Sequence, residues 1–299
     1  MAEHLRDPPE PAPARIATPW PRGEEDRGVV GAVFRNELRR AAGGFRFRAA
    51  AFLIVGLTAL AAFAAATGYR GEVLEQEAVA AAYQARLASA TVGQAVEILH
   101  PAIRPPWNLA LAVEGGQSST PDLYEQALSA QVSPELRRIR SANPRLPGRE
   151  PLDWMFVVRV VLSLAAFLLG YDAICGDRRR GTLKLALTYP APRWKLLAGK
   201  FLALWACLAA PFLAGAALSL ALAAGPGGIP FSAGDLAKAG LVALLGLWAA
   251  AFFVLAALLV SSLTREPSAS LSVLVWIWVT AVLVVPAASG LLAHRLHPL

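Results

Sequence analysis

Long, uninterrupted runs of apolar residues dominate the hydrophobic pattern of the chain. They occupy residues 49–66, 154–169, 201–224, 241–263 and 269–292. Each run approaches the ~20 residues that an α-helix needs to cross ~30 Å of hydrocarbon. The runs do not alternate between polar and apolar positions, so a membrane β-barrel is disfavoured. A soluble helical bundle is also disfavoured, because its helices would carry polar stripes and these runs have almost none. The pattern predicts an all-α polytopic membrane protein with about five transmembrane helices.

The spans and the connections between them predict the organisation of the chain. We expect, in order, a disordered cytoplasmic tail (1–28), an amphipathic interfacial helix (29–48), a first span (49–68), an extracytoplasmic insertion (69–153), a second span (154–175), a cytoplasmic segment (176–194), further spans at 195–224, 236–263 and 269–293, and an extracytoplasmic end (294–299). The first span starts too far from the N-terminus, and is too long, to suit a secretion signal. We therefore interpret it as an uncleaved anchor.

The helix expected at residues 29–48 carries Val30, Val33, Phe34 and Leu38 on one face. Such a pattern suits a helix lying in the inner interface of the membrane. An ordinary cytoplasmic extension of the first span is the alternative, and the sequence leaves both open.

Basic residues indicate the orientation of the spans. Arginines precede the first span, and Arg178, Arg179, Arg180 and Lys184 fill the connection after the second. Both positions are cytoplasmic under the positive-inside rule, and they agree because two spans separate them. We therefore expect a multi-pass protein of the inner (cytoplasmic) membrane with its N-terminus in the cytoplasm.

The large connection at residues 69–153 would then lie outside the membrane. Its first thirty or so residues have high helix propensity, whereas Pro and Gly punctuate the chain after Pro101. We expect a small, mostly helical extracytoplasmic insertion. Its lone His100 has no adjacent carboxylate pair or cysteine, so the insertion offers no candidate catalytic centre.

Composition supports the membrane prediction. The chain is 56% apolar and 16% charged, with a formal net charge of +7 and a pI near 9.9. The basic residues flank the spans and belong to no nucleic-acid motif, so we expect lipid-bilayer contact and no nucleic-acid partner. Two cysteines, Cys175 and Cys207, give no disulfide framework.

The connection between the second and third spans has a distinctive sequence, YDAICGDRRRGTLKLALTYPAPRWKLLAGK, at residues 171–200. Gly176 is expected to end the second span, and Thr182 to cap a short helix that ends before Pro190. A short amphipathic helix held between two spans would suit contact with a cytoplasmic partner. A basic loop that only sets topology remains an alternative on these grounds.

This connection resembles the motif of ABC-2 type permease subunits. The matching positions are Gly176, Asp177, Arg180, Gly181, Thr182, Leu183, Pro190, Arg193, Gly199 and Lys200. The stretches RPPWNLALAVEGG (104–116) and VVPAASGLL (284–292) resemble the branch with a large external insertion, related to permeases of nitrous-oxide-reductase maturation and gliding systems. The resemblance runs from about residue 30 to the end.

The resemblance implies a type V exporter-like fold and a permease subunit of an ATP-driven transporter. Its coupling helix would contact a separate cytoplasmic ABC ATPase, and a second permease subunit would complete a homo- or heterodimer. The implied ATPase-coupling residues are Asp177, Arg178, Arg179, Arg180, Gly181, Thr182, Leu183, Lys184, Leu187, Pro190 and Arg193. Family members usually have six spans, whereas about five are expected here, which leaves a missing terminal span, a truncated chain and a divergent form as alternatives. The alternative is a membrane anchor or assembly subunit whose external part recruits a partner.

Enzymatic motifs are absent from the sequence. The nearest approach to a phosphate-binding loop, WKLLAGKF, has Trp194 in place of the first glycine and Phe201 in place of the hydroxyl residue. ATP and Mg²⁺ are therefore expected on the partner subunit, with no cofactor or metal in this chain. Arg159, inside the second span, and Pro211, inside the third, are possible residues of the transport pathway, although Arg159 could instead reach outward to the interface.

Overall fold

The computed structural model describes residues 25–95, 98, 100–114, 123–126, 135–137, 152–188 and 192–296. Most of the expected N-terminal tail (residues 1–24), Pro190 and the last three residues lie outside the described part of the chain.

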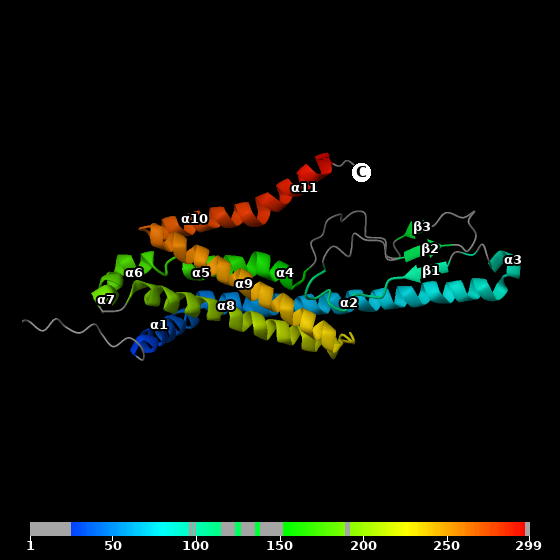
Figure 1. Ribbon diagram of the computed structural model, residues 1–299, viewed down its shortest axis with the longest axis horizontal. Coiled ribbons are helices and arrows are strands. Elements are labelled where there is room, and N and C mark those ends of the chain that lie inside the picture. The colour runs from blue at the N-terminus through cyan, green and yellow to red at the C-terminus, as the bar shows by residue number, and fades with distance from the viewer. Residues whose placement is uncertain are drawn as a thin grey trace, which may run out of the picture.

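Five helices are long and apolar enough to cross a membrane, by length and composition. They are Phe45–Ser89, Trp154–Arg180, Arg193–Ala224, Ala233–Leu263 and Pro267–Ser289. In Figure 1 the first, third and fourth of these are single helices, namely α2 (Phe45–Ser89), α8 (Arg193–Ala224) and α9 (Ala233–Leu263). The second consists of α4 (Trp154–Phe156), η2 (Val157–Leu162), α5 (Ser163–Gly170) and α6 (Cys175–Arg180). The fifth consists of α10 (Pro267–Val279), continued by η3 (Thr280–Val284) and α11 (Val285–Leu296). The predicted all-helical membrane architecture is confirmed.

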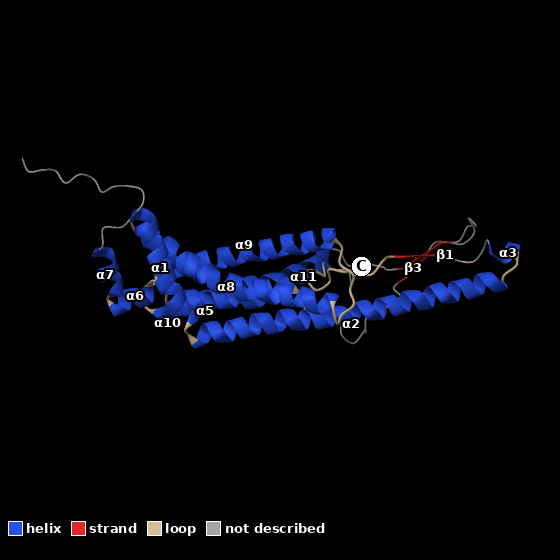
Figure 2. Ribbon diagram, turned by 90° about the horizontal axis from the view of Figure 1, so that it is seen from below, coloured by secondary structure: helices blue, strands red, loops and turns tan. Residues whose placement is uncertain are grey.

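The helices α2, α5, α8 and α9 form a bundle around a shared apolar core (Figure 2). Trp154, Phe212 and Leu162 are among the largest fully buried side chains. The Trp154 indole N–H donates to Ser219 Oγ at 3.0 Å, which satisfies a polar group inside the core. Apolar packing thus joins the second, third and fourth spans.

The last span is the least covered by protein. Only 11% of its apolar window is buried, against 56% for the second span. Leu274 packs with Phe167 and Ala257, and the Trp278 indole N–H donates to Ser163 Oγ at 2.9 Å. These contacts attach α10 to α5 and α9, whereas α11 lies apart from the bundle in Figure 1.

The helix expected at residues 29–48 is divided in two. Helix α1 (Glu25–Ala42) ends at a turn at Gly43 and Gly44, and α2 begins at Phe45. Val33 of α1 packs against Gly199 of α8, where an added Cβ would lie 2.6 Å from the valine Cγ1. Part of the apolar face of α1 therefore contacts the protein.

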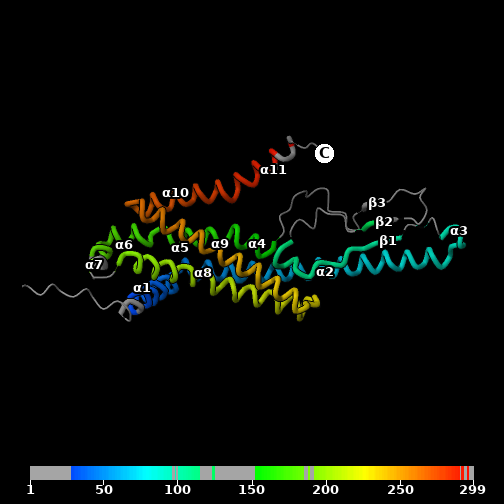
Figure 3. Tube along the Cα trace, in the orientation of Figure 1, coloured from blue at the N-terminus to red at the C-terminus, as the bar shows by residue number. Residues whose placement is uncertain are grey.

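The region between the first and second spans combines a helix with a small sheet. Helix α2 continues without a break to Ser89, far beyond the expected end of the first span (Figure 3). After α3 (Val92–Ala95), strands β1 (His100–Ile103), β2 (Leu123–Gln126) and β3 (Glu135–Arg137) pair antiparallel in the order β1-β2-β3. The strands were not predicted, because they are short and β1 contains a proline.

The sheet packs beside the C-terminal half of α2, as Figure 2 shows. Gln76 Nε2 donates to the Arg104 carbonyl at 2.8 Å, and the rings of Tyr83 and His100 meet edge to face. The following loop enters the bundle, where Leu109 and Leu111 are buried, and the Trp154 N–H donates to the Leu111 carbonyl at 3.0 Å.

Candidate functional site

The connection after the second span folds into a turn and two short helices. After a turn at residues 171–174, α6 ends at Gly181 and α7 (Thr182–Thr188) follows. Gly181 has φ of 78°, a left-handed conformation that glycine adopts without a Cβ clash. The prediction that Gly176 ends the span is wrong, since Gly176 lies inside α6. Both glycines suited a helix end, and the sequence did not discriminate between them.

Helix α7 lies at the end of the molecule opposite the sheet (Figure 1) and packs against α6. Thr182 is its first residue, and its hydroxyl donates to the Asp177 carbonyl at 3.2 Å, so the predicted N-cap role is replaced by a bond to α6. The helix ends at Thr188, before Pro190, as expected. Lys184 is exposed and Leu183 is half-buried, while the side chain of Leu187 lies outside the described part.

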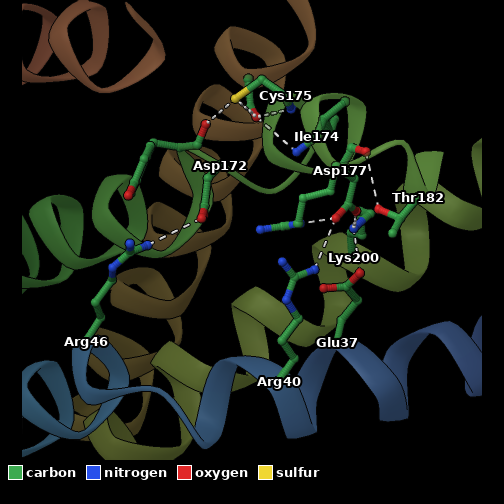
Figure 4. A network of polar contacts seen from close by, with 12 residues as sticks. Glu37, Arg40, Arg46, Asp172, Ile174, Cys175, Asp177, Thr182 and Lys200 are labelled. Carbon is green, nitrogen blue, oxygen red and sulfur yellow. Dashed lines mark hydrogen bonds and ion pairs between the residues drawn. The ribbon is translucent and has the colours of Figure 1, made fainter. Parts of the chain in front are cut away.

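Asp177 is the centre of a buried charged network (Figure 4). Lys200 Nζ donates to its Oδ2 at 2.6 Å, while Arg180 Nη2 and Arg40 Nη1 donate to its Oδ1 at 2.9 and 3.1 Å. Lys200 also donates to Glu37 Oε1 at 2.5 Å. These five residues, here called the Asp177 network, come from α1, α6 and α8.

Burial makes the Asp177 network depend on its internal pairing. Asp177 and Lys200 are each only 8% exposed. A buried charge costs several kcal/mol unless it is paired and hydrogen-bonded. For Arg40, burial opposes the charge, but the hydrogen bond to Asp177 and the attraction of that carboxylate outweigh it and raise the pKa above its usual value. Arg40 therefore stays cationic at neutral pH.

The three consecutive arginines have different environments. Arg178 donates to the carbonyls of Thr264 and Ser262 at 3.2 and 3.1 Å, at the end of α9. Arg180 binds Asp177, within its own helix. Arg179 is 63% exposed and lies 4.0 Å from Glu266. Arg179 therefore presents an exposed cation.

Two further contacts tie the turn before α6 to other helices. Ser261 Oγ, on α9, accepts the backbone N–H groups of Ile174 and Cys175 at 3.0 and 3.2 Å. Arg46 Nη1, on α2, donates to Asp172 Oδ2 at 3.5 Å, and its guanidinium lies 4.9 Å from the Tyr171 ring centroid. Figure 4 shows these contacts beside the Asp177 network. The turn and α6 are therefore held from several sides.

The other candidate residues lie outside the Asp177 network. Arg193, the first residue of α8, is exposed. Arg159 is partly buried in η2, and Pro211 is buried inside α8. Within the described ranges, no group of three or more His, Cys, Asp or Glu residues is placed to hold a metal ion.

Comparison with known proteins supplies the family. Residues 32–297 match the model of the family described as "ABC-2 family transporter protein". The chain belongs to the ABC-2 family. The match covers most of α1, all five long apolar helices and the connection with the Asp177 network, so the resemblance deduced from that connection is confirmed. Permeases of this family are non-catalytic.

Two curated relatives share short segments with the ABC-2 permease. One, "Probable ABC transporter permease protein NosY" of Pseudomonas aeruginosa, is 57% identical over 42 residues, or 14% of this chain and 15% of the relative. The protein of the same name from Stutzerimonas stutzeri is 48% identical over 65 residues, or 21% of this chain and 24% of the relative. The alignments thus span less than a quarter of this chain and at most 24% of these relatives.

Sequence reasoning missed two members of the Asp177 network and gave a third no role. Glu37 and Arg40 were not among the candidates, and Lys200 was noted only as part of the motif. A signal was available: Lys200 directly precedes a long apolar run, where an ionisable group needs a partner.

Proposed function

We propose that this ABC-2 permease is the membrane subunit of an ATP-driven exporter, with its N-terminus in the cytoplasm. A separate cytoplasmic ABC ATPase would bind and hydrolyse ATP, and a second permease subunit, identical or different, would complete the translocation unit. Support comes from the family and from α6 and α7, which follow the second span and carry Arg178, Arg179, Arg180 and Lys184.

The observation that carries this proposal is the attachment of α6. Its polar groups bind α1, α8 and the end of α9. A protein pressing on α7 would therefore act on three helices of the bundle. These helices would adopt two arrangements. Nucleotide shifts the balance between them when the nucleotide-bound ATPase binds one arrangement more tightly than the other.

The contacts within the chain refine the list of ATPase-coupling residues. Asp177, Arg178 and Arg180 bind partners in this chain, so we assign them supporting roles. Arg179, Lys184 and Arg193 are exposed and cationic, and we assign them to direct contact with acidic groups of the ATPase. Exposed charges at the edge of an interface affect the association of the two proteins more than the folding of either one.

Co-purification from cells expressing the permease with its candidate ATPase tests the proposal. The double variant Arg179→Glu/Lys184→Glu should recover at least about tenfold less ATPase, equivalent to about 1.4 kcal/mol of binding. Lys238→Glu, at an exposed lysine of α9, is the matched control and should recover the wild-type amount. Undiminished recovery with the double variant would reject this contact surface.

A membrane anchor that recruits an external partner is the second candidate function. The packed sheet on the outer half of α2 favours it, because it forms an ordered structure outside the spans. An anchor would retain its external partner and show no ATPase in the same purification.

A further inference from the structure

Helix α7 has two connections to the third span. One is covalent, through residues 189–192, which lie between α7 and α8. The other runs through side chains: α7 packs against α6, the Thr182 hydroxyl donates to the Asp177 carbonyl, and the Asp177 carboxylate accepts from Lys200 of α8. The second connection is a series of polar contacts between packed helices. Such a series transmits displacement more directly than the covalent connection alone.

Lys200 is the only residue of the Asp177 network that α8 contributes. Its ammonium lies between two carboxylates from different elements, Asp177 of α6 and Glu37 of α1. One group thus joins the connection after the second span to both the third span and the cytoplasmic helix.

The local packing favours concerted movement of α1 and α8. Val33 of α1 sits against Gly199, the residue before Lys200, closely enough that an added Cβ would meet the valine side chain. Close packing at this point leaves little room for the two helices to slide independently.

We infer that Lys200 is a positioning residue for energy coupling, which fastens α6 to α8 and α1 so that movement of α7 reaches the third span. This inference rests on the proposed function, because it assumes that an ATPase moves α7. It assigns to Lys200 a role in transmission, distinct from the role of Arg179 and Lys184 in binding the ATPase.

These contacts predict at which helix the nucleotide-driven movement ends when Lys200 is replaced. Without the Lys200 ammonium, α7 still carries its exposed cations and still binds the ATPase. Its movement, however, is no longer delivered to α8. A reporter on α7 should therefore respond to nucleotide while a reporter at the far end of α8 does not.

The experiment uses the full permease purified with its ATPase and reconstituted in lipid. Single cysteines are placed at two exposed positions, Thr188→Cys at the last residue of α7 and Ala224→Cys at the last residue of α8. Their maleimide labelling rates are compared without nucleotide and after trapping with ATP and vanadate. In the wild-type background, both rates should change on trapping.

In the Lys200→Gln background, we expect the change at Thr188→Cys to remain and the change at Ala224→Cys to be lost, with ATPase recovery unaltered. Lys200→Arg, which keeps the cation, should restore the response at Ala224→Cys. Lys238→Gln, at an exposed lysine of α9, serves as control and should leave both responses intact.

A charge-balanced variant guards against loss of folding. Glu37→Gln/Lys200→Gln removes one charge of each sign and leaves Asp177 paired with Arg40 and Arg180. It should fold, bind the ATPase and lack the response at Ala224→Cys. A response at Ala224→Cys that persists in this variant or in Lys200→Gln overturns the inference. If no ATPase is recovered with the wild type, the proposed function itself fails.

Discussion

At the scale of single residues, one close approach between the first and third spans depends on a glycine. A Cβ added to Gly215 of α8 would lie 3.2 Å from Val55 Cα and would overlap Thr58 Oγ1. The Thr58 hydroxyl donates to the carbonyls of Ile54 and Val55 at 2.9 Å, so it is turned back onto its own helix. Small residues at such crossings allow membrane helices to pack through their backbones.

The variant Gly215→Ala should lower the free energy of unfolding by roughly 1–3 kcal/mol, because the new methyl group must separate α2 from α8. Thermal unfolding in detergent, followed by loss of monodisperse protein, measures the change. Gly240→Ala, in α9, is the control, since an added Cβ there meets nothing within 4 Å. Equal midpoints for the two variants would contradict the proposed close packing.

Residue roles were also where sequence reasoning was least complete. The motif identified Asp177 as important, but its type and position suggested a surface charge facing another protein. It is instead buried, because its partners come from distant positions, with Glu37 lying 163 residues before Lys200. Without homologues or coordinates, no local pattern links charges at such separation.

At the scale of elements, α6 connects two groups of helices through its polar side chains. On one side it reaches α1 and α8 through the Asp177 network. On the other, Arg178 binds the carbonyls of Ser262 and Thr264, where α9 ends. Arginine at a helix C-terminus satisfies carbonyls that lack partners within the helix and complements the helix dipole.

Two neighbouring arginines should therefore respond differently to truncation. Arg178→Ala should destabilise the permease by about 1 kcal/mol, since it removes two hydrogen bonds from a charged donor at a partly solvated site. Arg179→Ala should leave stability unchanged and weaken ATPase recovery. Thermal unfolding and co-purification measure both quantities on the same samples. A destabilised Arg179→Ala, or an Arg178→Ala that unfolds like the wild type, would contradict these roles.

Elements with strong patterns were predictable and those with weak patterns were not. The long apolar runs located all five long apolar helices, and proline correctly marked the end of α7. Strands β1, β2 and β3 each have three or four residues, too few for an alternating pattern. The π-helical turns η2 and η3 lie within apolar runs, where composition carries no information about hydrogen-bond register.

At the scale of the whole molecule, the length of α2 separates the three-stranded sheet from the bundle. A helix of 45 residues spans about 67 Å at ~1.5 Å per residue, more than twice the ~30 Å hydrocarbon thickness. With the first span at its beginning, the second half of α2 should stand clear of the membrane. Figure 1 shows α2 extending beyond α8 and α9 toward the sheet.

Thiol labelling in intact cells and in inverted vesicles tests this arrangement. A membrane-impermeant maleimide should label Glu77→Cys, exposed on the outer half of α2, in intact cells, and Lys184→Cys only in inverted vesicles. The native Cys175 and Cys207 are 0% and 2% exposed and should give little background. Phe52→Cys, within the apolar run, is the control and should label slowly from both sides. Labelling of both test sites from one side would refute the orientation.

The loop at residues 104–114 places a limit on how the outer region can be exchanged. Leu111 is buried among bundle residues, its carbonyl accepts the Trp154 N–H, and Asn108 Nδ2 donates to the Pro230 carbonyl. A chimera that replaces the sheet region with a foreign domain must therefore retain this loop and its contact with the α8–α9 connection. Joining the graft at the ends of the apolar runs would leave the top of the helix bundle open to water.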